Sequence, residues 1–164
     1  MKRAQIDAFC GCRETLYQRI VFFAAPAILL AGIVYVAVRY AQLPAEIPSH
    51  YNFYGEIDGY GSRGTLWITP VIGILCDALM LAVSFFPQTW NVGTSVTVFN
   101  RALVYRRVRD LIADIRLSTA VMFTAVAVWQ TALAPTFPWG MGVLIGVCCT
   151  APLVRFFVRL AMKK

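Results

Sequence analysis

Four long stretches of the chain are almost continuously apolar, and shorter polar segments separate them. The apolar stretches are residues 20–38, 66–86, 117–134 and 139–162. Each approaches or reaches the ~20 residues that a helix needs to cross a hydrocarbon core of ~30 Å. A backbone in lipid must satisfy its own hydrogen bonds, so each stretch is expected to be a helix. The pattern predicts an all-α membrane protein, a bundle of four transmembrane helices.

The first apolar stretch is too long for a signal-peptide core of roughly 7–15 residues, so we expect it to be retained. Before it, residues 1–19 place apolar side chains at helical spacing, which predicts an amphipathic helix lying in the headgroup region. Residues 87–116 form a second basic segment with partly helical periodicity. This periodicity could make residues from about 98 to 133 a single helix.

Composition supports the membrane assignment, since 59% of the chain is hydrophobic and only 14% is charged. The net charge of +7 reflects 15 basic residues, and all of these except Arg39 and Arg63 lie on one side of the predicted bundle. The positive-inside rule therefore places both termini in the cytoplasm, and we expect the bacterial cytoplasmic (inner) membrane. Anionic lipid headgroups are the expected partners of this basic face, and nucleic acid is not expected.

The five cysteines all fall in segments predicted to be cytoplasmic or inside the bilayer. They are Cys10, Cys12, Cys76, Cys148 and Cys149. None lies in an external loop, so disulfides across the exposed face are excluded. The pair Cys10 and Cys12 lacks further ligands at recognisable metal-site spacing, so small packing residues are favoured over a metal site.

The loop between the first two spans, residues 39–65, combines turn-forming and polar residues in a way that a plain tether does not. Pro44 and Pro48 stiffen the chain as it leaves the membrane, and Gly55 permits a tight turn. We expect a compact folded external cap, with a short hairpin around residues 50–53.

The loop carries a pattern formed by Leu43, Pro44, Ile47, Pro48, His50, Tyr51, Asn52, Gly55, Asp58 and Arg63. This pattern resembles the signature of a bacterial membrane domain that forms the N-terminal part of SdpI-type toxin immunity proteins. Arg63 stands where Lys is expected, Tyr51 stands where Phe is usual, and the immunity proteins carry further membrane helices. The resemblance implies binding of a toxin peptide or membrane partner, with immunity or signalling as the outcome.

Three interpretations of the loop chemistry remain open. His50 and Asn52 could hydrogen-bond the loop backbone, while Asp58 stabilises a turn or pairs with Arg63. The same side chains could contact a partner. Imidazole and carboxylates could also bind zinc or manganese, with Glu46 and Glu56 as further ligands. The structural interpretation is favoured, and no metal or cofactor is predicted.

Asp77 is the polar residue inside the second apolar stretch. At 1.5 Å per residue it lies about 16 Å into the span, where a charge is costly, so it should face protein. Thr124 and Thr150 lie at a similar depth and are candidate hydrogen-bond partners, whereas Arg155 is placed deeper and is not favoured. The predicted role of Asp77 is to join helices.

Small residues at spacing of four predict a helix-packing seam on the fourth span. The seam is Gly142, Gly146 and Thr150, and it could face the bundle or a second copy. A homo-oligomer is therefore one arrangement that the sequence allows.

No catalytic motif accompanies these features: the chain has one histidine, no nucleophile elbow and no phosphate-binding glycine loop. We therefore expect a non-enzymatic protein that binds a toxin peptide or membrane partner through its external loop. The alternative is an accessory subunit of a larger integral membrane complex. A small transporter is the third option.

Overall fold

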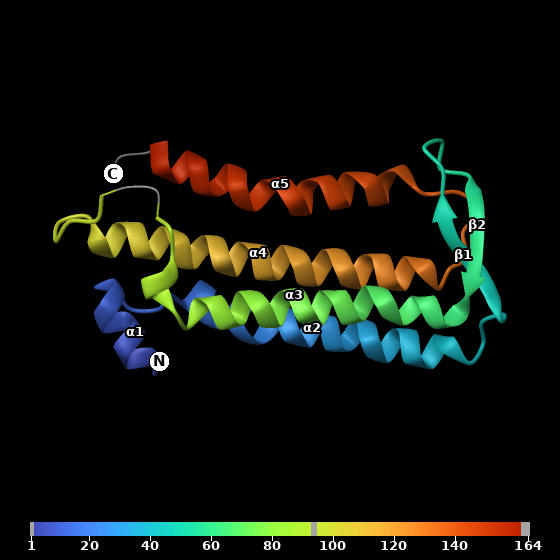
Figure 1. Ribbon diagram of the computed structural model, residues 1–164, viewed down its shortest axis with the longest axis horizontal. Coiled ribbons are helices and arrows are strands. Elements are labelled where there is room, and N and C mark those ends of the chain that lie inside the picture. Colours follow the sequence, from blue (N-terminus) through green and yellow to red (C-terminus); the bar gives the residue numbers. More distant parts are fainter. Residues whose placement is uncertain (1, 93–94, 162–164) are drawn as a thin grey trace.

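The computed structural model describes residues 2–92 and 95–161, so the last residue of the expected fourth span and the two terminal lysines lie outside it. The chain forms α1 (Arg3–Cys10), α2 (Leu16–Tyr40), β1 (Glu46–Tyr51), β2 (Ile57–Ser62), η1 (Arg63–Trp67), α3 (Ile68–Ser84), η2 (Pro87–Thr89), α4 (Arg101–Gln130) and α5 (Trp139–Ala161). The four long helices run side by side, with the hairpin across one end and α1 at the other (Figure 1).

The predicted all-α membrane fold is confirmed. Four helical segments of the described chain are long and apolar enough to cross a membrane: Leu16–Tyr40, Arg63–Ser84, Arg101–Gln130 and Trp139–Ala161. Their apolar side chains remain largely exposed in the isolated bundle, which is the arrangement expected where lipid covers the outer face.

The expected single helix over residues 1–19 is instead two elements. Gly11 adopts a left-handed conformation with φ of 66° and ends α1, a common way of terminating a helix. A capping box of Thr15 and Gln18 then begins α2. As a result α1 packs against α4, η2 and the start of the bundle, with Ile6 and Cys10 buried.

Residues 101–116 of the basic segment expected as loop or helix belong to α4, so the possible single helix over about 98–133 is present as Arg101–Gln130. This helix has 30 residues, so it is about 45 Å long at 1.5 Å per residue. It packs against α2, α3 and α5, which makes it the central element of the bundle. Residues 101–116 extend the helix beyond the apolar stretch that begins at residue 117.

Two glycines allow the closest helix approaches. A Cβ added to Gly73 would lie 2.9 Å from the Cβ of Phe123 on α4, and one added to Gly32 would lie 3.0 Å from Thr124. The seam predicted on α5 does not pack inside the bundle: a Cβ on Gly146 would meet no described neighbouring atom within 4 Å. Thr150 donates to the carbonyl of Gly146 within its own helix. The close helix contacts inside the bundle are therefore made at Gly32 of α2 and Gly73 of α3, and not at the seam of α5.

Candidate functional site

The cap is the segment from Leu43 to Arg63, built on an antiparallel pairing of β1 with β2. Its turn is organised by Asn52, whose Oδ1 accepts hydrogen bonds from the backbone N–H groups of Tyr54 at 2.9 Å and Glu56 at 3.0 Å. Gly55 has a φ of 81°, a conformation that a residue with a Cβ rarely adopts. The hairpin expected from the sequence is present. Asn52 closes its turn by hydrogen bonds, and Gly55 supplies the left-handed backbone conformation.

His50 and Asp58 face each other across the two strands. Nδ1 of His50 lies 2.5 Å from Oδ1 of Asp58, and the two side chains are 72% and 42% exposed. Asp58 therefore pairs with His50 and not with Arg63, which was the alternative considered from the sequence. Arg63 instead donates to the carbonyl of Leu43 at 3.0 Å and lies over the ring of Tyr40.

The two glutamates of the cap do not converge with His50 and Asp58. Glu46 stands at the far end of β1, in register with Ser62, and Glu56 accepts from Nδ2 of Asn52 at 3.1 Å. Within residues 2–92 and 95–161, no three His, Cys, Asp or Glu side chains gather closely enough to hold a metal ion. The metal interpretation of the loop therefore finds no geometric support.

The cap rests on the turn between α4 and α5. The hydroxyl of Tyr51 donates to the carbonyl of Ala134 at 2.9 Å, and the N–H of Phe137 donates to the carbonyl of Gly55 at 2.7 Å. The rings of Tyr51, Trp129 and Phe137 contact one another, with centroids 5.1 to 6.2 Å apart. Burial raises the pKa of Tyr51, and the nearby Tyr60 adds to the increase.

A cavity of about 380 Å³ lies between the hairpin, the end of α4 and Phe137 in the turn that follows α4. Its walls combine aromatic rings with polar groups. The sequence motif supplies Pro48, His50, Tyr51, Asn52 and Gly55, and the remaining lining is Ser49, Phe53, Trp129, Gln130 and Phe137. Four other candidate residues, Pro44, Glu46, Asp58 and Arg63, do not line it. The sequence could not identify the wall formed by Trp129, Gln130 and Phe137, because those residues are far from the motif along the chain.

Asp77 is paired, as predicted, with protein, but its partner is not a threonine. Arg116 donates to both carboxylate oxygens of Asp77, at 2.8 and 3.0 Å, and the two side chains are only 5% and 7% exposed. Thr124 donates instead to the carbonyl of Ile28. Arg116 was missed because it precedes the apolar stretch, although the helical periodicity of the residues before it indicated that α4 continues through it.

Two further ion pairs fasten α5 to α4. Both acids lie on α4 one turn apart, and both arginines lie on α5, so the pairs form an antiparallel ladder. Two residues of α2, Tyr17 and Gln18, complete them by hydrogen-bonding the same acids. The pairs are Asp114 with Arg155, and Asp110 with Arg159 at 2.5 Å.

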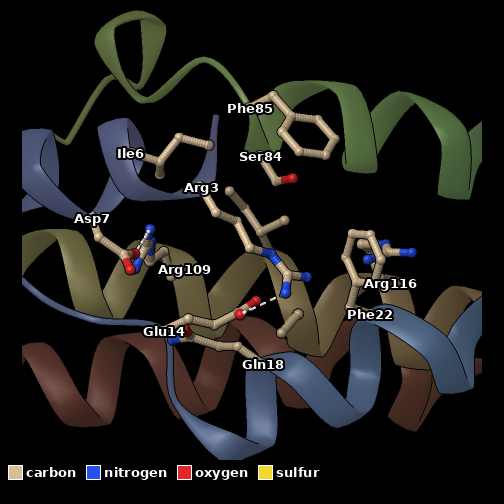
Figure 2. Close-up of a pocket in the computed structure, with 12 residues that line it drawn as sticks. Arg3, Ile6, Asp7, Glu14, Gln18, Phe22, Ser84, Phe85, Arg109 and Arg116 are labelled. Carbon is tan, nitrogen blue, oxygen red and sulfur yellow. Dashed lines mark hydrogen bonds and ion pairs between the residues drawn. The ribbon is translucent and has the colours of Figure 1, made fainter. Parts of the chain in front are cut away.

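Figure 2 shows a small cavity at the end of the bundle near α1, where side chains from α1, α2, α3 and α4 meet. Its volume of about 70 Å³ suits a few water molecules rather than an organic ligand. The charges around it are matched: Arg109 pairs with Asp7 at 2.7 Å and Arg3 with Glu14 at 3.3 Å. The cavity therefore presents no uncompensated charge for a ligand.

Cys10 and Cys12 lie in the apolar cluster beside this cavity. They are 0% and 7% exposed and pack near Tyr105. Burial raises the pKa of the Cys10 thiol above its ordinary value of 9.0. Both cysteines are buried in this cluster and form no disulfide.

Residues 27–74 match the sequence profile of a domain of unknown function (DUF1648). The match covers less than half of the chain and spans the later part of α2, the cap and the first part of α3. An uncharacterised protein of Archaeoglobus fulgidus is 25% identical over an alignment of 145 positions, and the alignment covers 79% of each of the two chains. No solved structure matches the sequence. The chain is thus a helical membrane protein that carries a segment similar to this domain.

Proposed function

We propose that this protein is a non-enzymatic membrane protein that binds a peptide or protein partner through its cap, in the manner of SdpI-type immunity proteins. The observation that carries the proposal is the cavity beside β1. Five residues of the loop motif line one cavity, and the profile of the matching domain spans that same loop. The motif residues therefore form part of the cavity wall in addition to the hairpin turn.

The cavity has the size and chemistry of a side-chain pocket. Its volume of about 380 Å³ lies at the lower end of the range for ligand pockets, roughly 300–1,000 Å³. Aromatic walls bury an apolar side chain, and His50, Asn52 and Gln130 offer hydrogen bonds that fix its orientation. Phe53 and Tyr54, at the hairpin turn, are 99% and 85% exposed and add apolar contact area.

His50 is the cap residue best placed for recognition. Asp58 engages its Nδ1, so the ring is oriented and a partner would be met by Nε2. Its side chain is 72% exposed, so the fold does not require the imidazole for packing.

A protection assay tests the proposal. Cells that produce the protein are challenged with spent culture medium from the source organism, which contains its secreted peptides, and survival is compared with cells that lack the protein. Wild type should protect, and His50→Ala should lose protection at unchanged abundance. Glu46→Gln, an exposed cap change outside the cavity, should protect normally.

Gly55→Val separates a lost contact from a broken cap. Because Gly55 has a φ of 81°, a β-branched residue there should lower the folded yield as well as protection. If His50→Ala lowers the yield to the same extent, His50 is structural and its recognition role is refuted. If wild type gives no survival advantage over cells without the protein, the immunity function is refuted.

A specific observation favours the alternative of an accessory subunit. Only Pro152 is buried among the residues of α5, all of which are described, and the face with Gly142 and Gly146 has almost no neighbours. Such a seam suits a close contact with another membrane helix. In this case the wild type should migrate on a native gel above its monomer mass, and Gly146→Leu should release the monomer. Val147→Leu should not, because Val147 is 54% exposed and lies about 100° around the helix from Gly146. Wild type at monomer mass would count against this alternative.

A further inference from the structure

The walls of the cap cavity are rich in aromatic rings. Tyr51, Trp129 and Phe137 all line it, and none of its ten described lining residues is a lysine or an arginine. We propose that the cavity binds a cationic side chain, that of a lysine or arginine presented by a peptide or protein partner. The partner is the one assigned to the cap under the proposed function, on which this inference rests.

The three rings are inclined to one another and do not form a stack. The ring planes of Tyr51 and Trp129 meet at 45°, and the plane of Phe137 is inclined to these two by 61° and 77°. The face of an aromatic ring carries the negative part of its quadrupole, so it attracts a cation. Several rings around one cavity form the kind of aromatic cage that recognises ammonium groups.

The rings are held in place by the fold itself. The hydroxyl of Tyr51 donates to the carbonyl of Ala134 at 2.9 Å, and the N–H of Phe137 donates to the carbonyl of Gly55 at 2.7 Å. Trp129 belongs to α4, which packs against three other helices. The cavity is therefore preorganised, which lowers the entropic cost of binding.

Two carboxylates stand beside the cavity. Glu56 accepts a hydrogen bond at 3.1 Å from Nδ2 of Asn52, which lines the cavity. Asp58 pairs with His50, another lining residue, and both carboxylate side chains are exposed. Arg63 follows the end of β2 that is farther from the hairpin turn. A cation in the cavity would therefore lie near negative charge.

The cap is acidic although the whole chain carries a net charge of +7. Residues 43–63 contain three acids and one arginine, and residues 131–138, on which the cap rests, carry no charge. This end of the bundle, opposite α1, thus favours the approach of a cationic group (Figure 1). Lysine and arginine also have a long apolar stem, which can pack against the aromatic walls while the charged end is attracted to the rings and carboxylates.

Binding of short synthetic peptides to the full chain tests the ligand class. The protein is kept in micelles of an uncharged maltoside detergent, so that no lipid headgroup competes, and affinities are measured by saturation-transfer NMR titration. One probe pair is acetyl-Gly-Lys-Gly-amide and the same peptide with Nε-acetyl-lysine, which keeps the stem and removes the charge. The second pair compares arginine with citrulline. The charged member of a pair should bind about tenfold more tightly.

Variants locate the cation in the cavity. Trp129→Leu should remove most of the preference for the charged peptide. Trp139→Leu is the matched control, because Trp139 is 91% exposed and does not line the cavity, and it should keep the preference. Glu56→Gln should reduce the preference by about twofold to fivefold, the range for an exposed charge pair, whereas Glu46→Gln at the far end of β1 should not.

Equal affinity of charged and neutral peptides for wild type, or no measurable binding of any peptide, would overturn the proposal. Full preference in Trp129→Leu that elutes like wild type in gel filtration would do the same. If Trp129→Leu aggregates, the glutamates decide, and an equal preference in Glu56→Gln and Glu46→Gln overturns the proposal. These probes need no secreted peptide, so the two functions can fail separately. Protection of cells without a charge preference would overturn the cationic ligand alone, and a charge preference without protection would refute immunity alone.

Discussion

Replacing Asp77 by Asn tests the buried ion pair that joins α3 to α4. Asn keeps the size of the side chain but removes its charge, so Arg116 is left buried with an uncompensated positive charge. Both side chains are at least nine-tenths buried, and two hydrogen bonds of 2.8 and 3.0 Å connect them. The substitution therefore isolates the energetic consequence of leaving one member of the pair without its counter-charge.

The expected loss in the free energy of unfolding is about 3–5 kcal/mol, the range for removing one partner of a buried pair. Coulomb's law gives a similar size: two unit charges ~4 Å apart at an effective dielectric constant of ~20 attract by about 4 kcal/mol. Replacing both residues with apolar ones, Asp77→Leu with Arg116→Met, should restore most of the lost stability, because no charge then remains buried.

Reversible unfolding in mixed micelles with increasing SDS measures these free energies, with tryptophan fluorescence as the signal. Asp58→Asn is the matched control, since the same chemical change is made at an exposed ion pair with His50, and a loss of about 1 kcal/mol or less is expected. If Asp77→Asn loses no more than Asp58→Asn, the Arg116 side chain reaches water or headgroups in the membrane, and the reasoning from burial is refuted.

Three further predictions follow from the topology, the helix packing and the buried thiol. In a cysteine-free background, Ser49→Cys should react with an impermeant maleimide in intact cells and Ser95→Cys should not; the reverse would invert the membrane orientation. Gly73→Ala should lower stability by about 1–3 kcal/mol because the added Cβ would lie 2.9 Å from the Cβ of Phe123, whereas Gly146→Ala should change it little, as measured by SDS unfolding. Alkylation of Cys10 in the folded protein should remain slow up to pH 9 and rise only above it, because burial raises the pKa of its thiol; rapid alkylation at pH 8 would show that the α1 cluster opens.

The hairpin of the cap was accessible to sequence analysis because its determinants are local. Asn52 closes the turn with its own side chain, and Gly55 supplies the left-handed conformation three residues later. Which surface the hairpin covers was not accessible. Its support on Ala134 and Phe137 depends on where the far ends of α4 and α5 emerge, and no local pattern records this.

The four membrane spans could be predicted from the hydropathy profile along the sequence alone. A span must be apolar over about 20 residues and must satisfy its backbone within its own helix, so length and hydropathy suffice to find it. The face that each helix turns toward its neighbours is not contained in that property. Small residues occur on both α3 and α5, yet Gly73 packs tightly and Gly146 meets no described neighbour within 4 Å.

The ion pairs show the same division between sequence and tertiary structure. The sequence alone determined that Asp77 must face protein, since lipid penalises a charge wherever the helix is rotated. Only the tertiary structure decided that its partner is Arg116, 39 residues later in the chain. That choice depends on the continuation of α4 beyond its apolar stretch and on its rotation against α3. Both are set by the packing of whole helices, because side-chain contacts across a bundle are determined by the relative position of two rigid elements and not by the residues beside either charge.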